Sequence, residues 1–306
     1  MLVIAKLTTP AMEKFNRKHK DIAAGMRQYS FTRDAWRRLS RNRTAVLGMC
    51  IIILLALTAV FADFITPYGQ FAVNIKHANQ PPNALHWFGT DTMGRDIFTR
   101  CIYGARYSLS IGIACMLCAL AVGGTLGLVS AYFGRTVDTA IMRITDILSS
   151  IPAVLMAIIM IAALGNGIPQ LIIAMTISFL PGMTRTVRAA IFTTRQSDYI
   201  ESCRCIGASN IRVMFRHMMP NALGLITISA VGQISGCIMV ISTLSYIGLG
   251  ITPPTPEWGA LLAAGKNSIL IYPHMVLFPG LMIMVTVLGF NTFGDGLRDA
   301  LDPRLK

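Results

Sequence analysis

The sequence of 306 residues has few charged side chains, since Asp, Glu, Lys and Arg together make up only 13% of it. Soluble globular domains carry about 25% of these residues. Hydrophobic residues make up 54% of the chain, and its mean hydropathy is +0.58. The shortage of charge excludes a disordered chain and an ordinary soluble enzyme. The composition predicts a polytopic membrane protein.

Acidic residues are especially scarce, with 14 Asp and Glu against 27 Lys and Arg, for a formal net charge of +13. A nucleic-acid-binding protein could share this basic excess, but it would not combine it with such high hydropathy. We therefore expect no nucleic-acid partner. The expected surroundings are a lipid bilayer, whose anionic headgroups attract basic segments.

Five runs of the sequence lack Lys, Arg, Asp and Glu, and they contain 19, 28, 38, 40 and 28 residues. A helix needs about 20 apolar residues to cross a membrane. The third run is long enough for two helices, and the turn-forming residues 165–169 divide it. We predict an all-α membrane protein with six transmembrane helices, near residues 45–64, 107–133, 147–164, 169–185, 222–247 and 274–294.

The basic residues predict the orientation. With the N-terminus in the cytoplasm, 22 of the 27 Lys and Arg residues lie on the cytoplasmic side, as the positive-inside rule requires. Both termini are therefore predicted inside. The basic stretch before the first helix is too long for a cleavable signal peptide. Residues 33–43 fit either an amphipathic helix on the inner leaflet or a solvated basic tail.

The chain divides into three predicted parts. Residues 1–44 form a basic cytoplasmic segment, and residues 45–106 contain the first transmembrane helix and an outer loop. Residues 107–306 form a core of five helices with a cytoplasmic loop at 186–221.

Catalytic and metal-binding motifs are absent from the sequence. It has no HExxH motif and no pair of membrane-embedded aspartates, so an intramembrane enzyme is disfavoured. Cys115 and Cys118 have CxxC spacing but lie in an apolar segment without a histidine or acidic neighbour, and packing explains them better than metal binding. The glycine pairs Gly123–Gly127 and Gly232–Gly236 predict close helix packing.

Ionisable residues are almost absent from the predicted spans, whereas ion-coupled transporters usually carry some there. A stand-alone secondary transporter remains the main alternative from another class. The absence of ionisable residues from the spans favours a protein that a partner supplies with energy.

The cytoplasmic segment 198–221 has the pattern of two short helices joined by a glycine. Asp198 and Glu201 have the spacing of a capping box, and Gly207 suits a left-handed helix end. A second helix is expected to start at Ala208 and Ser209 and to reach Pro220 at the next span. Such a pair fits docking to a cytoplasmic partner, although an ordinary amphipathic loop would show the same periodicity.

The spacing of Glu201, Gly207 and Pro220 resembles the EAA loop of ABC importer permeases, with Ser202 and Cys203 in place of two alanines. In that family the loop forms a coupling helix that sits in a cleft of the ATPase subunit. The resemblance implies that ATPase coupling uses Tyr199, Glu201, Ser202, Cys203, Gly207, Ala208, Ser209, His217 and Pro220.

Further motifs resemble the C-type permease subunit of dipeptide and oligopeptide importers (DppC/OppC type). They occur in the expected order over residues 33–305, and they include residues 36–43 and 290–303. Those predicted in the outer loops are Gly89, Thr90, Asp91, Gly94, Arg95, Asp96, Pro256, Glu257, Trp258 and Gly259. We expect Asp91, Arg95 and Asp96 to form a charge-paired cluster, either stabilising the fold or contacting substrate.

The resemblance implies a type I ABC importer permease fold in a bacterial or archaeal plasma membrane. The chain would be a non-catalytic subunit that binds no cofactor, while ATP and Mg²⁺ are used by partner ATPases. Its expected partners are a second homologous permease subunit, two ATP-binding subunits and an extracytoplasmic solute-binding protein. The expected substrates are di- or oligopeptides, with glutathione or nickel as alternatives within the family.

Overall fold

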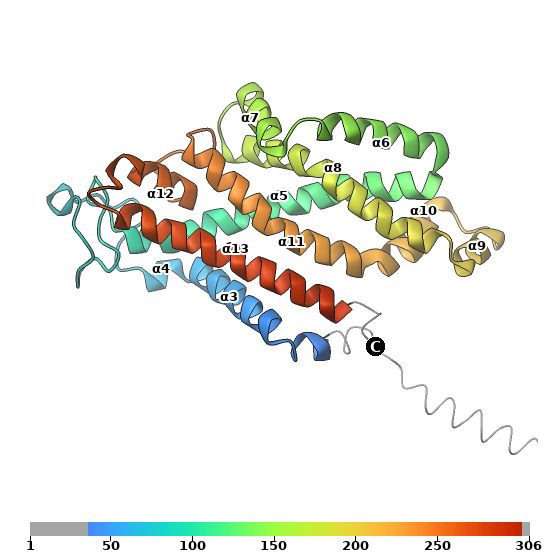
Figure 1. Ribbon diagram of the computed structural model, residues 1–306, viewed down its shortest axis with the longest axis horizontal. Coiled ribbons are helices and arrows are strands. Elements are labelled where there is room, and N and C mark those ends of the chain that lie inside the picture. The colour runs from blue at the N-terminus through green and yellow to red at the C-terminus, as the bar shows by residue number, and fades with distance from the viewer. Residues whose placement is uncertain (1–35, 302–306) are drawn as a thin grey trace, which may run out of the picture.

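A computed structural model describes residues 36–301, and within this range the regular elements are helices (Figure 1). The long helices run along the long axis of an elongated bundle. One end of the bundle holds α9 and α10 together with the start of α3 and the end of α13 (Figure 1). The opposite end holds α12 and the connection between α4 and α5 (Figure 1).

The principal helices, in chain order, are α3 (Arg43–Val60), α4 (Ala62–Ile65), α5 (Ile97–Phe133), α6 (Arg135–Ser149), α7 (Ala153–Leu164), α8 (Ile168–Arg195), α9 (Asp198–Cys205), α10 (Asn210–Arg212), α11 (Met219–Tyr246), α12 (Trp258–Gly265) and α13 (His274–Leu301). A π-helical turn, Val213–Met218, joins α10 to α11.

Four helices in the described range are long and apolar enough to cross a membrane, namely α3, α5, the continuous stretch Asn210–Tyr246 and α13. A fifth span is possible if α6 and α7 count as one broken helix, bent by 86°. The six spans and the cytoplasmic location of both termini stay predictions. The start of α3 and the end of α13 do lie at the same end of the bundle (Figure 1).

The predicted span 147–164 is wrong in its extent. Its first residues belong to α6, and α7 has only 12 residues. At 1.5 Å per residue, α7 is about 18 Å long, which is too short to cross the hydrocarbon core alone. Pro152 precedes α7 and disfavours helical geometry at Ile151, so α6 ends at Ser149.

Other helices extend past their predicted limits, among them α8, which continues to Arg195 although its span was predicted to end at residue 185. α5 begins at Ile97, ten residues before the predicted span, because the Asp96 side chain accepts a hydrogen bond from the Thr99 N–H and caps the helix. α13 continues to Leu301 and includes Asp295 and Arg298, which the prediction placed after the span. Charge-free runs locate apolar segments, but hydrogen-bonded caps decide where the helices end.

Glycine permits the close packing of α5 on α8. A Cβ atom on Gly127 would lie 2.5 Å from the Thr184 carbonyl oxygen, and one on Gly123 would lie 3.0 Å from the Leu180 carbonyl oxygen. The predicted packing role of this pair is confirmed. The pair Gly232–Gly236 behaves differently, since a Cβ on Gly232 would meet no atom within 4 Å.

Small residues also bring α3 against α13. A Cβ atom on Gly296 would collide with Ala45, and one on Gly48 would collide with the side chain of Thr292. Asn42 caps α3 and donates from Nδ2 to Asp299 Oδ2 at 3.3 Å. Of the predicted amphipathic segment 33–43, residues 33–35 lie outside the described range, and residues 36–39 are helical.

Two ion pairs attach α6 to α8. Arg188 donates to both carboxylate oxygens of Asp138, at 2.5 and 2.6 Å, and Arg185 donates to Asp146 at 2.8 Å. The hydrogen bonds from Arg188 lower the pKa of Asp138 below its usual value. A lowered folded-state pKa means that this pair stabilises the fold above the unfolded pKa, and that the contribution is lost as the pH falls through the folded pKa.

Candidate functional site

The helix pair at 198–221 is anchored to the bundle by one buried side chain. Ile200 is fully buried in the same hydrophobic cluster as Val213, Met214 and Met218 from the segment that leads into α11. Cys203 and Ala208 pack against this cluster. Because α9 is held by its inner face, its outer face remains open.

The turn after α9 is a Schellman motif centred on Gly207. The Ala208 N–H donates to the Cys203 carbonyl at 3.1 Å, and the Gly207 N–H donates to the Arg204 carbonyl at 3.0 Å. Gly207 has φ +82°, in the left-handed region that favours glycine. No heavy atom lies within 4 Å of a Cβ built on it, so the requirement is for backbone conformation and not for space.

The start of α9 differs from the predicted capping box. The residue at the N-cap position is Ser197, and its side chain makes no capping hydrogen bond. Asp198 and Glu201 lie in the first turn, where their carboxylates interact favourably with the helix dipole. The prediction that Glu201 caps the helix is therefore wrong. The second helix starts at Asn210, one residue after Ser209.

Polar contacts connect this helix pair to its neighbours. Tyr132 at the end of α5 donates its hydroxyl to Asn210 Oδ1 at 2.7 Å, and the Arg204 guanidinium lies 4.9 Å from the Tyr132 ring centroid. Asn221 Nδ2 donates to the Tyr199 hydroxyl at 2.9 Å and to the His217 carbonyl at 2.6 Å. α9 is thus linked to both α5 and α11.

The open side of the pair carries large apolar side chains. Ile206 is 83% exposed, Ile211 69% and Phe215 50%. Glu201, Ser202, Gly207, Ser209 and Pro220 are exposed as well. An exposed apolar group of this kind is typical of a protein–protein contact.

Asp91 organises the other predicted region, at the opposite end of the bundle. Its Oδ1 accepts hydrogen bonds from the N–H groups of Met93 and Arg95, both at 2.9 Å. Its Oδ2 accepts from Arg95 Nε at 2.6 Å and from Arg100 Nη1 at 2.8 Å. Arg100 also donates to the Pro254 carbonyl at 3.1 Å and so connects the two outer loops.

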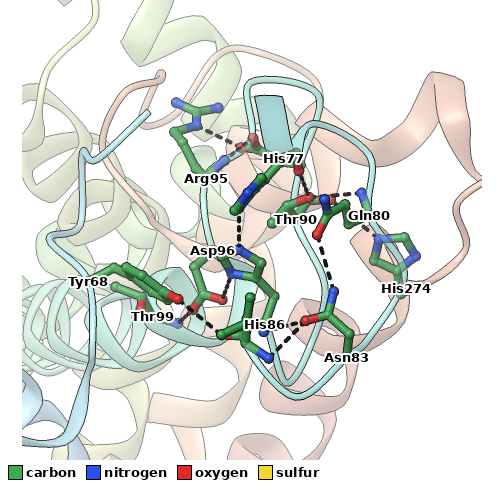
Figure 2. A network of polar contacts seen from close by, with 12 residues as sticks. Tyr68, His77, Gln80, Asn83, His86, Thr90, Arg95, Asp96, Thr99 and His274 are labelled. Atoms are coloured by element: carbon green, nitrogen blue, oxygen red, sulfur yellow. Dashed lines mark hydrogen bonds and ion pairs between the residues drawn. The ribbon is translucent and has the colours of Figure 1, made fainter. Parts of the chain in front are cut away.

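Asp96 makes further buried polar contacts with His86 and Thr99 (Figure 2). Its Oδ1 lies 2.9 Å from His86 Nδ1, while its Oδ2 accepts from the Thr99 N–H at 2.7 Å. His86 Nε2 lies 3.2 Å from His77 Nδ1, and the Thr90 hydroxyl donates to the His77 carbonyl (Figure 2). This network fixes residues 77–99 as a cap over the start of α5.

The predicted residues 256–259 complete this end of the bundle. Glu257 is fully buried, caps α12 through the Ala260 N–H at 3.0 Å, and accepts a hydrogen bond from Ser108 at 3.1 Å. Trp258 is also fully buried and donates from Nε1 to the Cys101 carbonyl at 2.9 Å. A Cβ atom on Gly259 would collide with the Ser242 backbone.

Close backbone approaches explain the outer-loop glycines. Gly89 and Gly94 have φ values of +77° and +70°, and a Cβ atom on Gly94 would collide with the Asn74 carbonyl. Gly104 lies against the Pro256 carbonyl and the Trp258 ring, each 2.6 Å from the position of its Cβ. Within the described residues, the outer-loop motif is held by contacts inside this chain.

The sequence reasoning missed several members of these networks, and three of them hold the outer loops together. It did not select His86, Arg100 or Ser108 as site residues. The signal for His86 was its position three residues before Gly89, where the outer-loop motif starts. Arg100 and Ser108 lie on α5, two turns apart, and only the packing of the loops onto α5 shows that they meet Asp91 and Glu257.

The cysteines form no disulfide or metal-binding group in the described part of the chain. All seven are free thiols, and no group of three His, Cys, Asp or Glu side chains there could hold a metal ion. Cys115 is buried and Cys118 is exposed, so the CxxC spacing does not bring the two together in one environment.

The fold and these two regions define a helical, multi-span membrane protein with an exposed helix pair at one end and a polar cap at the other. Residues 123–306 match the family described as binding-protein-dependent transport system inner membrane component. Residues 30–82 match the N-terminal TM domain of oligopeptide transport permease C.

Curated relatives agree over nearly the whole chain. The dipeptide transport system permease protein DppC of Alkalihalophilus pseudofirmus is 42% identical over 274 residues, which are 90% of each chain. The glutathione transport system permease protein GsiD of Pectobacterium atrosepticum is 40% identical over 275 residues, 90% of this chain and 91% of that protein. GsiD of Shigella sonnei is 42% identical over 272 residues, 89% and 90% of the two chains.

The chain belongs to the family of binding-protein-dependent transport system inner membrane components, in the DppC/OppC-type branch of ABC importer permeases. It is a non-catalytic, multi-pass protein of the bacterial inner membrane with the type I ABC permease fold. The stand-alone secondary transporter is excluded by this membership. Membership also implies partnership with an ATPase and a binding protein.

Proposed function

We propose that this chain is one of two different permease subunits of an ATP-driven importer of di- or oligopeptides. Two ATPase subunits on its cytoplasmic side and one solute-binding protein on the outside would complete the importer. The peptide substrate is supported by a relative that carries dipeptides and by others that carry glutathione, itself a small peptide. Glutathione is therefore the second candidate substrate.

The observation that carries this proposal is the position of α9. It is a short exposed helix, held by Ile200 and turned by Gly207, between the long helices α8 and α11 at the end of the bundle that we predict to be cytoplasmic. Closure of an ATPase dimer against α9 would displace both helices together. Such a displacement would open the pathway alternately to the two sides without any charge relay in the spans.

Replacing Gly207 by valine tests the coupling role. A β-branched residue at φ +82° is strained by about 1–3 kcal/mol, so we expect the turn after α9 to change and ATP-driven uptake to fall about tenfold or more. Membrane insertion should be unchanged, because nothing packs against this position. Uptake and the amount of protein in the membrane are the two measurements.

Two controls accompany that variant. Gly207→Asn should retain more uptake, because asparagine tolerates left-handed geometry better than valine. Gly69→Val places the same side chain at another glycine with no neighbour within 4 Å and no positive φ, and it should leave uptake unchanged. Normal uptake by Gly207→Val, with the ATPase still bound, would refute the coupling role.

Uptake in cells that lack this chain tests the substrate. Labelled dipeptide, labelled glutathione and nickel are supplied separately, and the chain is restored from a plasmid. We expect the restored chain to recover dipeptide uptake. This uptake should require ATP and an ATPase subunit that co-purifies with the chain. Restoration of glutathione uptake alone would establish the second candidate, and restoration of nickel alone would refute a peptide importer.

A further inference from the structure

A cavity of about 460 Å³ lies between α11 and α13, in the half of the bundle nearer α9. Gly232 of α11 and Gly294 of α13 meet there, with the position of a Gly294 Cβ 3.6 Å from the Gly232 Cα atom. The absence of side chains at this crossing leaves the cavity open. Its lining includes the apolar Leu225 and Ile228 and the polar Asn291, Asp295 and Arg298.

Three polar side chains of α13 face this cavity from one side of the helix. Asn291, Asp295 and Arg298 follow each other at intervals of four and three residues, which places them in one row. The row exists because α13 continues past the predicted end of its span. None of the proposed coupling residues belongs to it.

The two charges in this row have no ion-pair partner within residues 36–301. Elsewhere in that range the carboxylates of Asp63, Asp91, Asp138 and Asp146 pair with arginine, while the exposed Asp198 and Glu201 of α9 also have no ion pair there. Even the neighbouring Asp299, on the α3 side of the helix, accepts a hydrogen bond from Asn42 at 3.3 Å. Asp295 and Arg298 therefore line an open cavity with a free carboxylate and a free guanidinium.

We propose that this cavity is a binding site for the transported peptide inside the permease. Arg298 binds the peptide's terminal carboxylate and Asp295 its terminal ammonium group. Asn291 donates from Nδ2 to a peptide carbonyl, because its Oδ1 already accepts a hydrogen bond from Ser235 at 2.6 Å. The inference rests on the proposed peptide-import function and adds a site that recognises both ends of the substrate.

The dimensions of the cavity agree with a short peptide. Asp295 and Arg298 are separated by about 4.5 Å of helix rise, and a dipeptide spans at most about 7 Å. Small-molecule sites have volumes of about 300–1,000 Å³ and combine apolar walls with a few placed polar groups. Leu225 and Ile228 supply the apolar wall here. Because opposite charges lie side by side, the site prefers a zwitterion to an anion or a cation.

Equilibrium binding to the complete detergent-solubilised importer, without its binding protein, tests this site. The probes are labelled alanyl-alanine, its N-acetyl form and its C-terminal amide. We expect Arg298→Gln to weaken alanyl-alanine binding about tenfold and Asp295→Asn to do the same, as for loss of one charge-assisted hydrogen bond. Arg298→Gln should bind the free acid and the amide equally, and Asp295→Asn should not distinguish the free from the acetylated amine.

Asp299→Asn is the matched control, since it neutralises a carboxylate on the other side of the same helix and should leave all three affinities unchanged. The proposal is wrong if the intact importer transports peptide but shows no saturable binding, or if either variant keeps the wild-type preference. It is also wrong if the variants release the second permease subunit, which would make the cavity a subunit interface. An intact importer that transports no peptide would instead refute the proposed function.

Discussion

Asp91→Asn is expected to lower the free energy of unfolding by about 3–5 kcal/mol, because it leaves two buried guanidinium groups without their counter-charge. The side chains of Arg95 and Arg100 are only 8% and 3% exposed, and both donate to the same Asp91 oxygen. Membrane proteins and soluble domains alike are marginally stable, so a loss of this size is severe. Unfolding of the purified subunit in detergent, followed by circular dichroism, measures it.

Asp63→Asn is the control for that result. Asp63 pairs with Arg106 at 3.0 Å, but the two side chains are 60% and 40% exposed. Hydrogen bonds from Tyr103 and Arg106 lower the pKa of Asp63, yet solvent screens this surface pair. The substitution should leave the unfolding free energy nearly unchanged. Equal losses for Asp63→Asn and Asp91→Asn would contradict the importance assigned to burial.

Gly127→Ala is expected to destabilise the protein by about 1–3 kcal/mol, because its methyl group overlaps backbone atoms that cannot move independently. The added carbon would lie 2.5 Å from the Thr184 carbonyl oxygen and 2.9 Å from the Arg188 nitrogen. We therefore expect the added methyl group to push α5 away from α8. The midpoint of thermal unfolding in detergent gives the measurement.

Gly124→Ala makes the same change one turn away, where the nearest atoms are side-chain carbons of Leu120 at 3.5 Å and Val187 at 3.9 Å. These are ordinary contacts, and alanine favours a helix over glycine by about 0.8–1.0 kcal/mol. Gly124→Ala should therefore be neutral or slightly stabilising. If Gly127→Ala and Gly124→Ala lowered the midpoint of thermal unfolding equally, the close approach of α5 to α8 at Gly127 would not be the cause of the destabilisation.

The sequence predicted the apolar helices better than their ends. The hairpin turn at Gly165–Pro169 and the left-handed Gly207 both depend on local backbone chemistry, and both are present. The break at Pro152 was also a local signal. The charge-free run crosses it, so the prediction joined the end of α6 and the short α7 into one span. Composition averages over such a break, whereas proline acts at one residue.

The polar network of the outer loops could be predicted only in part, because some of its contacts join residues that are far apart in the sequence. Asp91 and Arg95 are close in sequence, so their pairing follows from a local turn. The bond between Ser108 and Glu257 joins residues 149 positions apart, and it depends on how α12 packs against α5. The cavity between α11 and α13 is harder still, because it depends on the rotation of two helices about their axes.

The anchoring of α9 through Ile200 has a mechanical consequence. A load applied to the exposed face of α9 cannot rotate that helix freely, because Ile200 is embedded among Val213, Met214 and Met218. Compression and tension alike pass into the base of α11, while Asn210 transmits them to Tyr132 at the end of α5. The two long helices α5 and α11 are thus connected to α9 at one place, so a force on α9 acts on both of them together.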